Sequence, residues 1–104
     1  MDKFGISTDD WSAIIQIFKS EERIQEIVLF GSRAKGNFKP GSDIDLAMKG
    51  SELTLTNLID ISTMLDGLDL PYKFDLVLFD RIQEPKLTEH IERVGITIFD
   101  RKLL

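Results

Sequence analysis

Two aspartates stand two positions apart in a segment whose side chains alternate between apolar and polar. In residues 43–49, DIDLAMK, Asp43 and Asp45 share one face while three larger apolar side chains share the other, a pattern typical of a half-buried strand. Two neighbouring carboxylates repel each other unless a cation lies between them. The pair therefore suggests a cation site, and the alternative is a strand face that is simply exposed to water.

A glycine and a serine follow the apolar run of residues 27–30, at the point where a buried strand would end. Gly31 would let the backbone approach a ligand closely. Backbone N–H groups and the Ser32 hydroxyl, at the start of a following helix, could hold a phosphate. Taken alone, such a pair is more often a turn with a capping serine.

A third aspartate, Asp75, lies in the middle of the apolar segment of residues 72–79, YKFDLVLF. A carboxylate in so apolar a strand is costly unless it is paired or bound to a metal. A salt bridge to Lys73 or Arg81 is the alternative. If this strand lies beside residues 43–49, the three carboxylates can meet at one point. Three carboxylates can hold two divalent ions about 4 Å apart, which stabilises both the attacking and the leaving oxygen of a phosphoryl transfer.

The composition restricts which metal such a site could hold. The chain has no cysteine and one histidine, His90, so a zinc site has too few nitrogen and sulfur ligands. Oxygen ligands favour magnesium, manganese or calcium, and magnesium binds through one or two carboxylates together with substrate phosphates. His90 itself is expected to be a solvated residue on the surface of a helix.

The charge distribution indicates a small anion as the partner. The 104 residues carry a formal net charge of −5, which argues against strong direct binding of nucleic acid. Residues 27–42 contain no acidic residue, while Arg33, Lys35 and Lys39 lie among them, so a local cationic loop could neutralise a triphosphate. No apolar run approaches the roughly 20 residues of a membrane span. The polar N-terminus is unlike a secretion signal, so a cytoplasmic location is expected.

The elements that must position these residues follow one another as α-β-α-β-α-β-α-β. We expect a single domain over residues 1–104, with helices flanking a small mixed sheet, an α/β (α+β) architecture. The sequence predicts helices over residues 9–20, 31–36, 53–68 and 84–94, strands over residues 27–30, 43–49, 72–79 and 96–99, and a loop over residues 37–42.

The combined motif resembles that of a known family. The stretch GSRAKGNFKPGSDIDL, residues 31–46, is similar to the signature of the DNA polymerase β-like nucleotidyltransferase superfamily, and most closely to that of its minimal nucleotidyltransferases (MNT). The fragment DLPYKFDLV, residues 69–77, is similar to the strand that carries the family's third acidic residue. The resemblance covers nearly the whole chain and implies the nucleotidyltransferase fold.

The resemblance also implies roles for individual residues. The metal ligands would be Asp43 and Asp45, which bind both metals, and Asp75, which binds the catalytic metal and helps to deprotonate the attacking hydroxyl. The residues near the nucleotide would be Gly31 and Ser32 on the β- and γ-phosphates, Arg33 and Lys35 near the phosphates, and Ser42 close to the metals.

A nucleotidyltransferase of this group implies defined cofactors and partners. The resemblance implies two Mg²⁺ ions, with Mn²⁺ as a substitute, a nucleoside triphosphate that we expect to be ATP, and pyrophosphate as the leaving group. It implies a small all-helical partner of the HEPN or four-helix substrate-binding type, with the transferase acting as an antitoxin that places AMP on a tyrosine of a ribonuclease toxin. The alternatives are a non-catalytic module that binds nucleotide or masks its partner, and the catalytic half of a transferase for small molecules.

Overall fold

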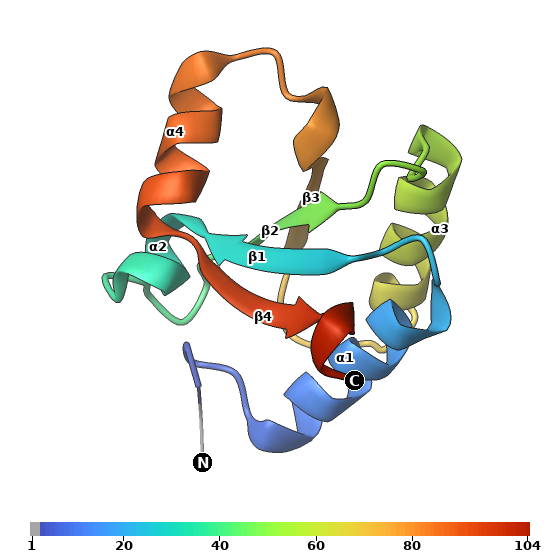
Figure 1. Cartoon of the computed structure of the whole chain (residues 1–104). Helices are drawn as coiled ribbons and strands as arrows, with labels where there is room; N and C mark the ends of the chain where they lie inside the picture. Colours follow the sequence, from blue (N-terminus) through green and yellow to red (C-terminus); the bar gives the residue numbers. More distant parts are fainter. Residues whose placement is uncertain (1–2) are drawn as a thin grey trace.

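The computed structural model describes residues 3–104, which form a four-stranded sheet with helices on both faces (Figure 1). The elements, in chain order, are α1 (Thr8–Ser20), β1 (Glu26–Phe30), α2 (Gly31–Lys35), β2 (Ile44–Lys49), α3 (Leu55–Asp66), β3 (Phe74–Leu78), the 3-10 turn η1 (Phe79–Arg81), α4 (Pro85–Val94), β4 (Ile96–Asp100) and the 3-10 turn η2 (Arg101–Leu103). The expected alternation of helices and strands is confirmed.

The sheet is mixed, with strand order β3-β2-β1-β4. β1 pairs antiparallel with both β2 and β4. β2 and β3 pair in parallel, and α3 supplies the crossover that a parallel pair requires. The strand that carries Asp75 therefore lies directly beside the strand that carries Asp45.

Each face of the sheet is covered by different helices (Figure 1). The larger core lies between the sheet and helices α1 and α3, and it includes Phe18, Ile61 and Leu46. The smaller core lies on the opposite face under α4, where Ile91 packs with Val28 and other apolar residues. The alternation in residues 43–49 explains this division, because its large apolar side chains enter the first core and Ala47 enters the second.

Local sequence signals fix the beginnings of two helices. Ser7 caps α1 by accepting a hydrogen bond from the Asp10 N–H at 3.2 Å. Thr54 and Asn57 form a reciprocal capping box at the start of α3, which satisfies backbone donors that the first turn would leave unpaired. In residues 3–104, no helix combines the length and the apolar character that crossing a membrane requires.

Two predicted strands are longer than the observed ones, and the difference affects the site. β2 begins at Ile44, not at residue 43, because the ladder to β3 starts where the Ile44 N–H donates to the Lys73 carbonyl at 2.8 Å. β3 ends at Leu78 because the chain turns into η1. Asp43 therefore lies just outside the sheet, and its position depends on the loop that precedes it.

Candidate active site

The parallel pairing of β2 with β3 brings two of the three aspartates together. Asp45 and Asp75 are partners in the register of these strands, so their side chains leave the sheet on the same face. Asp43 precedes Asp45 by two residues and its charge acts on Asp45. No ion pair joins Asp75 to Lys73 or Arg81 within the described chain.

The pKa of the Asp45 carboxyl is raised by its surroundings. Its pKa is raised from 3.8 to about 6, most of all by partial burial and then by the charges of Asp75 and Asp43 and a hydrogen bond with Asp75, while the charge of Arg33 lowers it. The sequence predicts that Asp75 is the carboxylate buried at a cost in free energy, and this prediction is wrong. Asp75 is exposed, while Asp45 is partly buried. The physical reason is that β3 is an edge strand and β2 is an inner one.

Gly31 lies directly against the Asp45 carboxylate. Phe30 is the register partner of Asp45 across the β1–β2 ladder, and the chain leaves β1 at Gly31 with φ of 74°. A Cβ atom on Gly31 would overlap a carboxylate oxygen of Asp45 and lie 3.0 Å from its Cγ. The glycine is therefore required both by the left-handed backbone and by the close approach of the strand that carries Asp45.

The five-residue helix α2 places Ser32 and Lys35 next to this glycine. The Ser32 carbonyl accepts hydrogen bonds from the N–H groups of Gly36 and Asn37 at 3.0 and 3.2 Å. Ser32 is half-buried and Lys35 is exposed. Among the described residues, neither the Ser32 hydroxyl nor the Lys35 ammonium has a partner within the protein, so both are available to a ligand.

Arg33 and Ser42 differ from the expected phosphate and metal contacts. Arg33 is 1% exposed, and its guanidinium donates to the Ser42 carbonyl at 2.8 and 3.2 Å and to the Phe4 carbonyl at 2.7 Å. The Ser42 hydroxyl accepts from the Lys39 N–H at 2.9 Å. Both side chains therefore hold the backbone of the loop that leads to Asp43. The contact of Arg33 with Phe4 joins segments 29 residues apart in the chain, which a local sequence pattern cannot show.

His90 was expected to be solvated, and the structure corrects this. It is half-buried on α4, and its ring meets the Phe30 ring edge to face with 6.1 Å between centroids. The helical spacing could have indicated this burial, because His90 follows Leu87 by three residues and precedes Val94 by four. That spacing places His90 on the apolar side of the helix. His90 thus packs beside the strand end from which the glycine turn begins.

The donor set fits a magnesium-like cation, although the side chains do not form a complete cage. In residues 3–104 no group of three acidic, cysteine or histidine side chains lies close enough to hold a metal ion. Asp45 and Asp75 nevertheless meet, and Asp43 is near enough to raise the pKa of Asp45. Magnesium takes one or two carboxylates and completes its shell with water and phosphate oxygens, and a cation there would offset the repulsion among the three charges.

Solved structures share this fold. A crystal structure of a toxin–antitoxin with AMP-PNP aligns with a TM-score of 0.72 at 24% identity, covering 89% of this chain and 75% of that one. A structure of a tri-AMPylated HEPN toxin of Shewanella oneidensis in complex with its MNT antitoxin aligns with a TM-score of 0.66 at 22% identity, covering 90% and 72%. These likenesses show the nucleotidyltransferase architecture that the resemblance implied.

Sequence comparison gives the family. The candidate protein adenylyltransferase MJ1217 of Methanocaldococcus jannaschii is 33% identical over 78 residues, which are 74% of this chain and 79% of that protein. The family described as polymerase beta, nucleotidyltransferase, matches residues 12–103, a span that contains the glycine turn and all three aspartates. The chain therefore belongs to the polymerase β nucleotidyltransferase family.

Proposed function

We propose that this nucleotidyltransferase moves AMP from ATP onto a hydroxyl of a partner protein, with Mg²⁺, and releases pyrophosphate. The observation that carries the proposal is the register pairing of Asp45 with Asp75 directly beside Gly31. It puts a paired carboxylate site next to the turn where a triphosphate would bind. Residues 1–104 act in this proposal as a single catalytic domain.

The three aspartates are the proposed metal ligands. Asp43, Asp45 and Asp75 would hold Mg²⁺, or Mn²⁺ in its place, and the bound metal supplies positive charge to the phosphoryl group during transfer. Asp75 has the exposed position that an incoming hydroxyl can reach, and we assign it the role of accepting the hydroxyl proton. The low exposure of Asp45 fits a ligand that stays in place while substrates exchange.

The turn after β1 is the proposed triphosphate site. Gly31 lets the backbone pass close to the phosphates, and the Ser32 hydroxyl donates to a phosphate oxygen. Lys35, exposed one helical turn later, adds positive charge to that region. Arg33 and Ser42 contribute by holding the neighbouring loop and not by contact with the nucleotide.

The acceptor is proposed to be a tyrosine of a small helical HEPN protein, with this chain acting as the antitoxin. Two observations support it. A solved neighbour is an MNT antitoxin bound to a tri-AMPylated HEPN toxin, and the relative from M. jannaschii is described as a candidate protein adenylyltransferase. The net charge of −5 would favour association with a basic partner.

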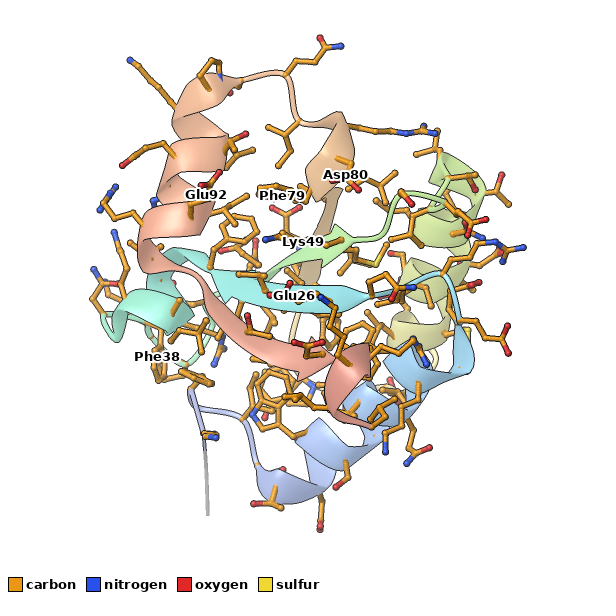
Figure 2. The ribbon with its side chains drawn as sticks, in the orientation of Figure 1. Glu26, Phe38, Lys49, Phe79, Asp80 and Glu92 are labelled. Carbon is orange, nitrogen blue, oxygen red and sulfur yellow. The ribbon has the colours of Figure 1, made fainter. Side chains whose placement is uncertain are left out.

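Transfer of label from ATP to the partner tests the proposal. The chain is incubated with α-phosphate-labelled ATP, Mg²⁺ and the helical protein encoded beside it, and label on the partner is measured. We expect labelling that the double variant Asp43→Asn/Asp45→Asn abolishes. Asp80→Asn, a change of an exposed aspartate in η1 (Figure 2), is the matched control and should label normally.

Two outcomes would overturn the proposed function. The first is that wild-type protein transfers no label under conditions in which the complex forms. The second is that the double variant forms the complex and inhibits the partner as well as wild type does, which identifies a masking module and not an enzyme.

A further inference from the structure

Arg33 joins three segments that lie far apart in the sequence. Its guanidinium donates to the carbonyl of Phe4 near the N-terminus and, through two nitrogens, to the carbonyl of Ser42. Its Cζ atom lies 5.1 Å from the ring centre of Phe38 and 5.4 Å from that of Tyr72. A buried arginine that uses its fork on backbone carbonyls and stacks on aromatic rings is held in one place.

The N-terminal segment is shaped to meet this guanidinium. Lys3 and Ile6 exchange backbone hydrogen bonds of 2.9 and 3.0 Å, and both residues between them have positive φ, 58° at Phe4 and 77° at Gly5. A Cβ on Gly5 would lie 2.8 Å from an Arg33 nitrogen. The backbone of this tight turn therefore packs directly against the Arg33 guanidinium.

The contact with Ser42 matters because the next residue is Asp43. The Ser42 carbonyl belongs to the same rigid peptide plane as the Asp43 Cα atom, so two hydrogen bonds to that oxygen fix the direction in which the chain enters Asp43. Asp43 precedes the first residue of β2, and the exposed segment before it contains Gly36, Gly41 and Pro40. The loop begins with the bonds of Gly36 and Asn37 to the Ser32 carbonyl and contains the Lys39–Ser42 turn, and Arg33 holds its far end at the Ser42 carbonyl.

We propose that Arg33 is a positioning residue that holds Asp43 within reach of the cation shared with Asp45 and Asp75. The inference rests on the proposed function, because that function gives Asp43 its role as a ligand. It assigns Arg33 a place behind the site, where it organises the loop and does not touch the nucleotide. Phe38, a residue of the loop after α2 (Figure 2) whose ring lies against the Arg33 guanidinium, is part of the same support.

Arg101 offers a matched control at the other end of the molecule. Its guanidinium donates to the backbone carbonyls of Ile24, Phe18 and Glu21 at 2.7, 3.2 and 3.0 Å, and its Cζ lies 5.2 Å from the ring centre of Phe99. It has the same type of contacts as Arg33 but holds the turn between α1 and β1. Replacement of either arginine by lysine removes a comparable set of hydrogen bonds.

The test measures cation binding without nucleotide, by the loss of free Mn²⁺ signal in electron paramagnetic resonance. Arg33→Lys should weaken Mn²⁺ binding about 10-fold or more, in the range seen when the support of a metal ligand is removed. Arg101→Lys should leave the Mn²⁺ affinity within about twofold of wild type, because distant sites act independently.

A second measurement follows the loop itself. Amide hydrogen exchange at Ser42 should be faster in Arg33→Lys than in wild type and unchanged in Arg101→Lys. Phe38→Leu, at a half-buried position, should weaken binding in the same direction and serves if Arg33→Lys does not fold.

The outcomes separate this inference from the proposed function. If Arg33→Lys and Phe38→Leu bind Mn²⁺ as wild type does, the positioning role is wrong, while labelling of the partner by wild type still supports the transferase. If wild type binds Mn²⁺ in an Arg33-dependent way and labels nothing, the proposed transfer is wrong and the positioning role stands. A wild-type chain that binds no Mn²⁺ overturns the positioning role, and it overturns the proposed function as well if the partner is not labelled.

Discussion

A side chain at Gly31 would be strained by the left-handed backbone, and its Cβ atom would have no room unless the Asp45 side chain moved. Gly31→Ala should therefore displace Asp45, and we expect transfer to fall about 100-fold, as a misplacement of about 1 Å can cause. The rate of partner labelling measures this. Circular dichroism establishes that the variant folds.

A second glycine, Gly36, allows the effect of the clash with Asp45 to be distinguished from the effect of the strained backbone. Gly36 also has a left-handed φ, 85°, but a Cβ there would meet nothing within 4 Å. Gly36→Ala should lower the free energy of unfolding by about 1–2 kcal/mol, the cost of the strained conformation that both glycine positions share. It should keep most of its transfer activity. Equal losses of activity in the two variants would contradict the role given to the contact between Gly31 and Asp45.

Asp45 should make the metal-free protein less stable as the pH rises. Its pKa in the folded state, about 6, lies above the ordinary 3.8, so the folded state holds the proton more tightly, and stability falls as pH rises from about 4 through 6. Asp45→Asn removes the titrating carboxyl and with it this fall in stability at higher pH. Allowing for solvent screening, we expect the variant to be more stable than wild type by the order of 1 kcal/mol at pH 7.5, with this advantage shrinking towards pH 4.5.

Thermal unfolding in EDTA at the two pH values checks this prediction. Asp80→Asn, at an exposed position, is the control and should show no comparable gain. An Asp45→Asn variant that is less stable than wild type at pH 7.5 would mean that Asp45 is held as a charged group by partners.

The residues proposed for the site were chosen from the sequence, but their relations in space could not be predicted from it. The alternation around Asp43 and Asp45 and the glycine after an apolar run are local signals, and they pointed to the residues that meet at one sheet face. The structural role of Arg33 could not be predicted, because its partners Phe4 and Ser42 approach it only in the folded chain.

At the scale of elements, α4 is held on the sheet by few residues. Ile91 is 1% exposed and is the one residue of the helix that is fully buried. Ile91→Ala should lower the free energy of unfolding by about 2–4 kcal/mol. Glu92→Ala, at the neighbouring exposed position (Figure 2), should change it by less than about 0.5 kcal/mol.

Urea unfolding followed by circular dichroism measures both variants. A loss below about 1 kcal/mol for Ile91→Ala would show that the helix is held chiefly by other contacts. The ring contact between His90 and Phe30 would then be the next to examine.

Element types were predictable and element ends were less so. Helical spacing with a capping signal located α1 and α3, because both signals lie within the helix and its cap. The end of β3 was missed because η1 begins at Phe79, an aromatic residue that suits a strand equally well. What ends the strand is the turn of the chain towards α4, which local propensity does not encode.

At the scale of the whole molecule, the decisive fact is which strands are neighbours. The sequence required β3 to lie beside β2 for the aspartates to meet, and it could state this only as a condition. Strand order depends on how both faces of the sheet are covered, by α1 and α3 on one side and by α4 on the other. This information is distributed over the whole chain.

The parallel pairing has a consequence for how the protein folds. β1 and β2 are joined by residues 31–43, whereas β2 and β3 are joined by the longer segment of residues 50–73, which includes the whole of α3. Pairing across such a crossover closes the longer loop, so we expect the β1–β2 pair to form the folding nucleus and the repulsion between Asp45 and Asp75 to arise after the rate-limiting step. In stopped-flow experiments without metal at neutral pH, Asp75→Asn should slow unfolding and leave the refolding rate unchanged, whereas Leu29→Ala in the β1–β2 pair should slow refolding. An equal effect of Asp75→Asn on refolding would mean that the two aspartates already meet in the folding nucleus.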